Sequence, residues 1–489
     1  MNTADAQHQS EHHADDTLAA WLPDLIFADG RFQSNLALIA DTRTGRVVHL
    51  TSDIENLPRV IRLTGQAILP GLVNAHSHSF QRVIRGRTEA RRNARDSFWT
   101  WREAMYSAAE RLTPEDVYDG ARMTFLEMAL TGITTVGEFH YLHHAREGTP
   151  YDDPNLLAGE VIRAARDIGI RICLLRTAYA RSGFGQPPNA RQRRFIYADA
   201  DDYLRDTDDL RATLAHGETD YAWLGVAPHS TRAVPLDFMR RVAGYAHTHD
   251  LPFHIHIAEQ PAELEQCREE TGRTPVRLLA DEGLLDCRTT CIHAIHVTDE
   301  EVAAIARQAA IVCACPTTER NLGDGIVPAD KFFAGDVAVA LGSDSHAQID
   351  LLEDARALEY HLRLQHLRRA VLAPESTTDE PHNTSALARR LFACASESGA
   401  RSLHAAGDAR QGLTGQLAPN SFADFFTVAL DDPSIAGARA EDLLPLVVFT
   451  LARSAIRDVF VGGRAVVREG RHTTQESIIA RFTALQRYG

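Results

Sequence analysis

Short apolar runs alternate with longer amphipathic stretches through the middle of the chain. Each run is bounded by glycine, proline or polar turn residues, which is typical of buried strands, and the stretches between them have helical spacing. The predicted strands cover residues 67–76, 133–139, 170–175, 222–229, 252–258, 290–295, 311–315 and 337–344. Strands and helices alternating over this length predict an α/β fold of the TIM-like (β/α)8 barrel class.

Helix starts between the runs support this reading. Thr113 followed by Pro114 predicts a cap with proline at the first helical position, and Thr298 with Glu301 forms a capping box. A doubly wound sheet is the alternative. It is disfavoured because no GxGxxG follows an early strand.

Both ends of the chain have a different pattern, with short strands separated by hairpin turns. Asp29-Gly30 and Thr44-Gly45 lie between apolar runs near the start, and Gly462-Gly463 does so near the end. These segments predict one small β-sandwich domain built from both chain ends. The predicted units are a disordered tail (1–18), the β domain (19–68 plus 411–475), the metal-dependent barrel (69–410) and a C-terminal helix (476–489).

Composition narrows the function classes. The formal net charge is −15, which argues against nucleic-acid binding and against an electrostatic membrane anchor. No apolar run approaches a membrane span, and the polar N-terminus has no signal core, so we expect a cytoplasmic protein. The seven cysteines lack zinc-site spacing and are expected to be reduced and buried.

Two histidines end the first predicted barrel strand at a spacing that allows a shared ligand. His76 and His78 are two residues apart, so their side chains project to the same side of a strand. Ionisable residues also lie at the carboxyl ends of other predicted strands, where barrel active sites collect: His229, His256, His293 and Asp344. These positions predict a metal site, with Glu259 just above a strand end to carry protons.

A second group of histidines follows the second predicted strand. His140, His143 and His144 crowd the segment EFHYLHH. We expect most of them to be loop residues that face the site or the solvent.

The strand-end residues resemble the amidohydrolase superfamily, in the mononuclear deaminase branch that includes cytosine, guanine and S-adenosylhomocysteine deaminases. The likeness rests on the first-strand HSH, the fifth-strand HIHIAE, the sixth-strand histidine, the eighth-strand SDS and the split β domain. It implies one zinc ion per chain, with iron or manganese as alternatives. The implied ligands are His76, His78, His256 and Asp344. The implied catalytic residues are Glu259, His293 and Asp344. The fourth strand lacks the bridging lysine of binuclear members, which favours one ion.

A closer resemblance, to the deiminases of histidine degradation within that superfamily, rests on longer segments. They are NAHSHSFQRVIRGRTE, DSFWTWREAMY, EFHYLHH, APHSTRAV, HIHIAEQ and CPTTERNLGDG. It implies hydrolysis of N-formimino-L-glutamate to N-formyl-L-glutamate and ammonia by zinc-activated water, with Glu259 as the proton shuttle. The implied substrate contacts are Gln81, Arg102, Tyr141, His229 and Arg232. Arg320, in TTER, stands where a small residue is usual, and the resemblance assigns no consequence to it.

The two arginines agree with such a substrate, because a protein of net charge −15 needs local cations to hold a dianion. We therefore expect a small dianionic substrate. We also expect a homodimer, and neither a nucleic acid nor a membrane as partner. A heterocycle deaminase of the same fold is one alternative, although it would not need two arginines. A non-catalytic metal-binding barrel is the other, and the presence of Glu259 and His293 argues against it.

Overall fold

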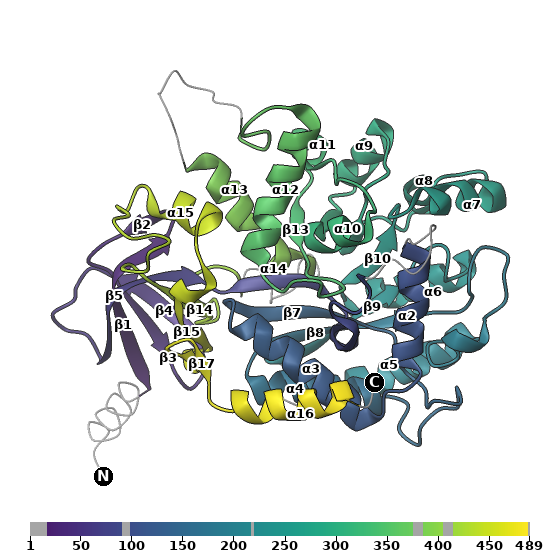
Figure 1. Cartoon of the computed structure of the whole chain (residues 1–489), viewed down its shortest axis with the longest axis horizontal. Coiled ribbons are helices and arrows are strands. Elements are labelled where there is room, and N and C mark those ends of the chain that lie inside the picture. The colour runs from purple at the N-terminus through teal and green to yellow at the C-terminus, as the bar shows by residue number, and fades with distance from the viewer. Residues whose placement is uncertain (1–16, 90–97, 217–219, 375–384, 404–413, 488–489) are drawn as a thin grey trace, which may run out of the picture.

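The computed structural model describes residues 17–89, 98–216, 220–374, 385–403 and 414–487. They form a β domain on one side and a larger barrel on the other (Figure 1). Residues 1–16 of the predicted tail lie outside the described residues, and so does the predicted boundary between residues 410 and 411.

The β domain combines strands from both ends of the chain, as predicted. They form one nine-stranded sheet in the order β17-β16-β15-β14-β5-β1-β3-β4, with β2 paired to β1. The strands are β1 (Leu18–Ala28), β2 (Arg31–Gln33), β3 (Ala37–Asp41), β4 (Arg46–Thr51), β5 (Arg59–Pro70), β14 (Phe425–Ala429), β15 (Ile456–Val461), β16 (Arg464–Arg468) and β17 (Arg471–His472). All three predicted hairpin turns join antiparallel neighbours. Trp21 meets Phe425 edge to face at 5.5 Å in the core of this sheet.

The predicted parallel barrel is present, and its eight strands follow one another in chain order. They are β6 (Leu72–Ser77), β7 (Ile133–His140), β8 (Arg171–Ala178), β9 (Ala222–Pro228), β10 (Phe253–Ile257), β11 (Thr289–His293), β12 (Ile311–Ala314) and β13 (Val339–Leu341). A parallel bridge between Ser77 and Asp344 joins the two ends of this sheet. There the Asp344 N–H donates to the His76 carbonyl at 3.0 Å. Ring closure thus places the end of the eighth strand beside the HSH segment.

Helices surround the barrel strands (Figure 1). They are η1 (Ser79–Ile84), α2 (Phe98–Ala109), α3 (Pro114–Ala129), α4 (Leu156–Ile168), η2 (Ala190–Gln192), α5 (Ala200–Ala215), α6 (Leu236–His249), α7 (Pro261–Thr271), α8 (Pro275–Asp281), α9 (Asp299–Arg307), α10 (Pro316–Leu322), α11 (Ala329–Ala334), α12 (Leu351–His366), α13 (Ala386–Cys394) and α14 (Glu397–Leu403). The remaining helices, α15 (Leu443–Phe449), η3 (Arg453–Ala455) and α16 (Gln475–Arg487), follow β14. None of the helices in the described part of the chain is long and apolar enough to span a membrane.

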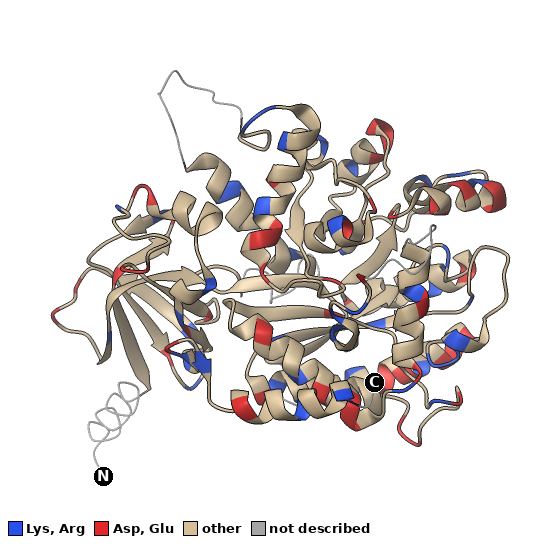
Figure 2. Ribbon diagram, viewed as in Figure 1, with Lys and Arg blue, Asp and Glu red and all other residues tan. Residues whose placement is uncertain are grey.

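The predicted helix starts are confirmed. The Thr113 hydroxyl accepts a hydrogen bond from the Asp116 N–H at 3.1 Å, and Asp116 accepts from the Thr113 N–H at 2.9 Å. The same reciprocal box joins Thr298 and Glu301 ahead of α9. Acidic and basic residues are interspersed along the outer helices in Figure 2, so the net negative charge is not gathered on one element.

The first predicted barrel strand, residues 67–76, is wrong as a single strand. Residues 67–70 end β5 and pair with β14 of the β domain, whereas β6 begins at Leu72. The chain changes sheet at Gly71, where a Cβ atom would lie 2.1 Å from the Thr134 hydroxyl. Only glycine, which has no Cβ atom, fits this close to Thr134 without displacing it. The chain can therefore pass from one sheet to the other at this residue.

A buried ion pair connects the two parts of the molecule. The Arg171 guanidinium, on the amino-terminal end of β8, donates from Nε to the Asp424 carboxylate at 2.7 Å, and both side chains are almost fully buried. Asp424 also accepts a hydrogen bond from the Gly462 N–H of a β-domain hairpin at 2.7 Å. This contact lies at the opposite end of the strands from the predicted site.

Candidate active site

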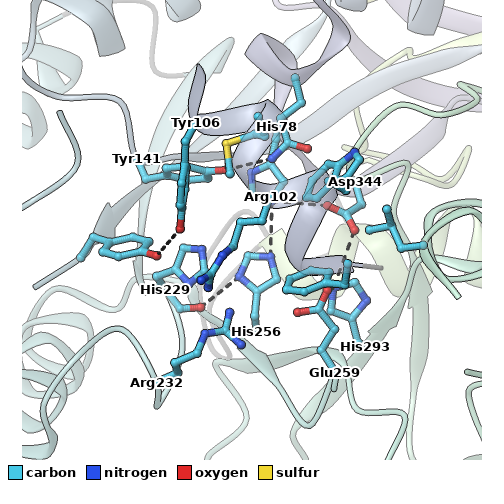
Figure 3. Close-up of a pocket in the computed structure, with 16 residues that line it drawn as sticks. His78, Arg102, Tyr106, Tyr141, His229, Arg232, His256, Glu259, His293 and Asp344 are labelled. Carbon is cyan, nitrogen blue, oxygen red and sulfur yellow. Dashed lines mark hydrogen bonds and ion pairs between the residues drawn. The ribbon is translucent and has the colours of Figure 1, made fainter. Parts of the chain in front are cut away.

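The residues predicted to carry chemistry lie together at the carboxyl ends of the barrel strands (Figure 3). His76 and His78 come from the end of β6, His256 from β10, and His293 from the end of β11, while Asp344 follows β13. Except for His76, which lies beneath, all the predicted site residues line one pocket: His78, Gln81, Arg102, Tyr141, His229, Arg232, His256, Glu259, His293 and Asp344. The structure therefore brings the whole predicted set into one site.

Three imidazoles and one carboxylate converge closely enough to share an ion. One potential ligand atom from each of His76, His78, His256 and Asp344 lies within 4.8 Å of the others. The Nε2 atom of His256 is 3.1 Å from that of His76 and 3.3 Å from that of His78. Oδ1 of Asp344 is 3.4 Å from Nε2 of both His76 and His78. We call these four residues the ligand cluster.

The other ring nitrogens show why this cluster suits a cation. Nδ1 of His78 lies 2.9 Å from the Phe139 carbonyl, and Nδ1 of His256 lies 3.0 Å from the His229 carbonyl. A carbonyl only accepts, so each Nδ1 carries the proton and each Nε2 presents a lone pair. Burial lowers the pKa of His76, His78 and His256, which keeps the rings neutral. Lone pairs facing one another at 3.3 Å repel unless a cation lies between them, so these donors fit a divalent ion.

A second set of ionisable groups surrounds His293. Its Nε2 is 3.6 Å from Oε1 of Glu259 and 3.7 Å from Oδ2 of Asp344. Burial alone would lower the pKa of His293, but the carboxylates of Glu259, Glu319 and Asp344 outweigh it and hold the pKa well above its usual value. The ring is thus a hydrogen-bond donor directed toward the pocket.

Glu259 lies beside the ligand cluster and does not belong to it. Its side chain is buried, and burial raises the pKa of the carboxyl group, although His293 and Arg232 act in the opposite direction. A carboxyl group with a raised pKa takes up a proton more readily than a free one, which suits it to give and take a proton during a reaction. Glu259 follows the end of β10, three residues after His256, as the sequence predicted.

Glu319, on the first turn of α10, is a residue that the sequence reasoning missed. Its carboxylate lies 3.2 Å from Nδ1 of His293 and accepts the Cys315 N–H at 2.8 Å, and its side chain is buried. This contact fixes the orientation of the His293 ring. The signal was available, because Glu319 lies just beyond the seventh barrel strand, at the edge where the other site residues were sought.

The backbone is strained where these strands end. His293 has φ of 71° and Asp344 has φ of 47°, in the left-handed region that residues other than glycine rarely adopt. Both residues stay there because neighbouring strands hold the segments, for example through the bridge between Ser77 and Asp344. Strain of this kind concentrates at functional sites, where it aims side chains into the pocket.

The predicted arginines line the same pocket as His78, His256 and Asp344 (Figure 3). Nε and Nη1 of both Arg102 and Arg232 are buried, and neither atom has a hydrogen-bond partner among the described residues. The Trp99 ring packs against both guanidinium groups, at 4.5 Å from Arg102 and 5.6 Å from Arg232. Buried guanidinium donors without partners cost free energy in the free protein, and a ligand carboxylate would satisfy them.

The remaining predicted contacts line the same pocket. The Gln81 amide donates to the Tyr141 hydroxyl at 2.8 Å, while Gln81 Oε1 is an acceptor with no partner in the described part of the chain. Burial lowers the pKa of His229 well below its usual value, and Arg232 lowers it further, so this ring is neutral. The pocket therefore offers both cationic donors and neutral polar groups.

Arg320 does not face the site. It is exposed on α10 and forms an ion pair with Glu353 at 3.0 Å. The histidines of EFHYLHH differ from expectation as well. His140, His143 and His144 are all buried and outside the pocket lining. The segment after η2 packs Tyr197 against His143 and His144 and supplies the Ile196 carbonyl as an acceptor for His144.

Comparisons with known proteins agree with this geometry. The model of the amidohydrolase family matches residues 67–466. The chain is 41% identical over 414 residues to the formimidoylglutamate deiminase of Pseudomonas aeruginosa, which covers 84% of this chain and 87% of that protein.

Solved structures share the fold. An amidohydrolase from Brucella melitensis superposes with a TM-score of 0.86 at 34% identity, covering 96% of this chain and 99% of the other. An adenosine deaminase from Xanthomonas campestris with bound zinc superposes with a TM-score of 0.78 over the same shares of the two chains. At 19% identity, the second likeness concerns the fold alone.

Proposed function

Because the chain belongs to the amidohydrolase family, and is thus a hydrolase, we propose that it hydrolyses N-formimino-L-glutamate to N-formyl-L-glutamate and ammonia. This reaction is the deimination step of histidine degradation. The relative from Pseudomonas aeruginosa, a formimidoylglutamate deiminase by name, supports this substrate.

The observation that carries the proposal is a pair of arginines with buried donor atoms that line one pocket with members of the ligand cluster. Arg102 and Arg232 present donor atoms that have no partner among the described residues, and Asp344 and His293 line the same pocket. N-formimino-L-glutamate carries two carboxylates and one formamidine. Guanidinium groups match carboxylates in shape and charge, so the arginines can hold the glutamate part while the formimino carbon lies at the ligand cluster.

The ligand cluster would hold one divalent ion. Zinc suits three imidazoles and one carboxylate, and iron or manganese are the alternatives. When bound, such an ion supplies Lewis-acid activation of a water molecule at neutral pH.

The surrounding residues provide the proton transfers. Asp344 directs Oδ1 toward the imidazoles and Oδ2 toward His293, so Oδ2 is free to take the proton that the attacking water loses. His293 donates a hydrogen bond to the incoming oxygen from Nε2. Glu259 protonates the formimino nitrogen as the water oxygen bonds to the carbon. It then takes the remaining hydroxyl proton and passes it to the same nitrogen, the carbon–nitrogen bond breaks, and ammonia leaves while the carbon keeps the oxygen as a formyl C=O. The proton held by Asp344 returns to Glu259 and restores both groups. Each such transfer typically contributes about 10²–10⁴-fold to the rate.

The test is ammonia release by the purified protein from N-formimino-L-glutamate, compared with adenosine, guanine, cytosine and 8-oxoguanine at equal concentration. We expect turnover of the formimino substrate and a rate at least 100-fold lower with each heterocycle, since a heterocycle leaves the arginines unpaired. Faster turnover of a heterocycle would overturn the proposal in favour of a ring deaminase. Bound metal without ammonia release from any of these compounds would indicate a binding protein.

A further inference from the structure

Behind the arginine side of the pocket lies a buried polar triad that the proposed chemistry does not use. Tyr106 comes from α2, Tyr179 follows β8, and Gln192 ends η2. The exposed fractions of these residues are 1%, 2% and 0%. The sequence reasoning singled out none of them, although Tyr106 ends the segment DSFWTWREAMY.

The orientation of the Gln192 amide follows from its neighbours. Its Nε2 lies 2.9 Å from the hydroxyl oxygen of Tyr106 and 2.9 Å from that of Tyr179. Its Oε1 accepts the Asn189 backbone N–H at 3.4 Å. A backbone N–H can only donate, so the carbonyl oxygen faces Asn189 and the NH₂ group faces the two phenols. Gln192 therefore donates to both tyrosines.

Counting hydrogens shows that one hydroxyl proton is left over. The two N–H and two O–H groups of the triad carry four hydrogens, but the triad contains three hydrogen bonds, including one of 3.2 Å between Tyr106 and Tyr179. One tyrosine donates to the other, and the second has an O–H without an acceptor. Among the described residues, no further hydrogen bond engages either hydroxyl oxygen.

The unpaired O–H belongs to a residue of the pocket lining. Tyr106 and Tyr179 line the same pocket as Arg102 and Arg232, and the Tyr106 hydroxyl lies beside the Arg102 guanidinium in Figure 3. Burial raises the pKa of the Tyr179 phenol far above its usual value, although both arginines lower it, so the group stays protonated. The pocket thus contains a neutral donor next to two cationic ones.

We propose that Tyr106 and Tyr179, with their protons directed by Gln192, donate a hydrogen bond to a carboxylate of the substrate alongside Arg102 and Arg232. This inference rests on the proposed function and deepens it. Three of the four phenol lone pairs already accept hydrogen bonds, two from Gln192 and one from the other phenol, and guanidinium groups only donate. Among the described residues, this end of the pocket therefore offers more donors than acceptors, and it favours a carboxylate over the carboxamide of the same size.

Two variants test the triad directly. Tyr106→Phe combined with Tyr179→Phe removes both hydroxyls. Gln192→Glu keeps the size but replaces the donor by an acceptor, which would draw both hydroxyl protons away from the pocket. We measure the Kd of N-formyl-L-glutamate and of glutarate by calorimetry. We also measure kcat/KM for N-formimino-L-glutamate and its two carboxamide analogues, N-formimino-L-glutamine and N-formimino-L-isoglutamine.

We expect the double variant to bind N-formyl-L-glutamate about 10- to 100-fold more weakly, the range for losing a hydrogen bond to a charged group. The loss should fall on KM more than on kcat. Gln192→Glu should weaken the binding of N-formyl-L-glutamate at least as much. It should also bring kcat/KM for the acid closer to kcat/KM for at least one of the two carboxamides. Each single Tyr→Phe change should cost less, because the remaining hydroxyl can redirect its proton, so the double variant loses more than the product of the single losses.

The matched control is Gln308→Glu, which makes the same change at an exposed position after α9. It should leave binding and the acid preference unchanged. Melting temperature and metal content establish that each variant is folded. If the double variant fails to fold, Gln192→Glu decides the question alone.

The inference would be overturned if the Kd of N-formyl-L-glutamate stayed within about twofold of the parent value and the ratio of kcat/KM for the acid to kcat/KM for the carboxamides did not change. Failure of the proposed function would be recognised separately, as absent ammonia release by the parent protein. In that case the calorimetric titration with glutarate still decides whether the triad contributes to carboxylate binding.

Discussion

Two groups of buried histidines lie on the barrel, and they differ in how their ring nitrogens are used. In the ligand cluster, the Nε2 atoms of His76, His78 and His256 converge to 3.1–3.3 Å. The second histidine group consists of His140, His143 and His144. There Nε2 of His143 lies 2.8 Å from the Thr177 carbonyl and Nε2 of His144 lies 2.9 Å from the Ile196 carbonyl.

The charged neighbours differ as well. The ligand cluster includes the Asp344 carboxylate, which attracts a cation. The second histidine group lies near the Arg176 guanidinium, which adds to burial in lowering the pKa of all three rings and repels a metal ion. The number of histidines in a local segment, three in EFHYLHH against two in HSH, therefore does not identify a metal site. Convergent lone pairs with a carboxylate beside them do.

The largest expected effect comes from removing a ligand. His256→Ala should lose most of the bound metal and lower kcat beyond the roughly 10⁴-fold expected for a single proton-transfer residue. His143→Asn, the matched change in the second histidine group, should keep its metal and most of its activity and lose only stability. Elemental analysis and ammonia release measure both. Metal retained by His256→Ala, or lost by His143→Asn, would reverse the assignment of the two groups.

The next effect separates metal binding from proton transfer. Glu259→Gln keeps the size of the side chain but cannot cycle a proton. We expect full metal content, near-parental affinity for N-formyl-L-glutamate and a kcat about 10²–10⁴-fold lower. If metal is lost with activity, Glu259 belongs with the ligand cluster. If kcat barely changes, the proton reaches the leaving nitrogen through His293 or Asp344.

A smaller effect is expected on the arginine side of the pocket. Removing one partner of a buried charge pair costs about 2–5 kcal/mol. Arg102→Met and Arg232→Met should each lower kcat/KM by about 30-fold or more, mostly through KM, with unchanged metal content. Arg320→Met, on the outer face of α10, is the control. Normal kcat/KM in both pocket variants would show that the dianion is held elsewhere.

The sequence predicted the parts of the site that follow from strand periodicity. Side chains two apart on a strand share a face, and parallel strands end at one rim, so His76, His78 and His256 could be brought together without coordinates. The end of one sheet and the start of the next could not be separated, because the apolar run continues through Pro70 and Gly71. The pairing of residues 67–70 with β14, and the close fit of Gly71 against Thr134, reveal the change of sheet.

The sequence also could not predict contacts between distant segments. Gln192 meets Tyr106 across 86 positions, and no motif links the two. The second histidine group was expected to face the site or the solvent because its covering segment, which supplies the Ile196 carbonyl, lies about 50 residues further along the chain. Packing of loops on barrel strands decides such contacts, and it leaves no periodic signal.

The smallest predicted effect concerns how the second histidine group responds to acid. Burial, aided by Arg176, lowers the pKa of His140 to about 3, whereas an unfolded histidine titrates near 6.5. Below pH 6.5 the unfolded chain therefore binds a proton that the folded protein does not, and stability is lost as the pH falls toward 3. Between pH 7.5 and pH 5 this one group accounts for a loss of about 2 kcal/mol.

His140→Asn removes the titrating group, so its free energy of unfolding should fall about 2 kcal/mol less than that of the parent over the same pH interval. Urea unfolding of both metal-free proteins at the two pH values measures the difference and removes any contribution from metal release. His216→Asn, at an exposed position after α5, is the control. An identical pH dependence in parent and variant would mean that His140 is protonated in the folded protein. A lowered pKa would then no longer characterise His140, and the contrast between the two groups would rest on the ligand cluster alone.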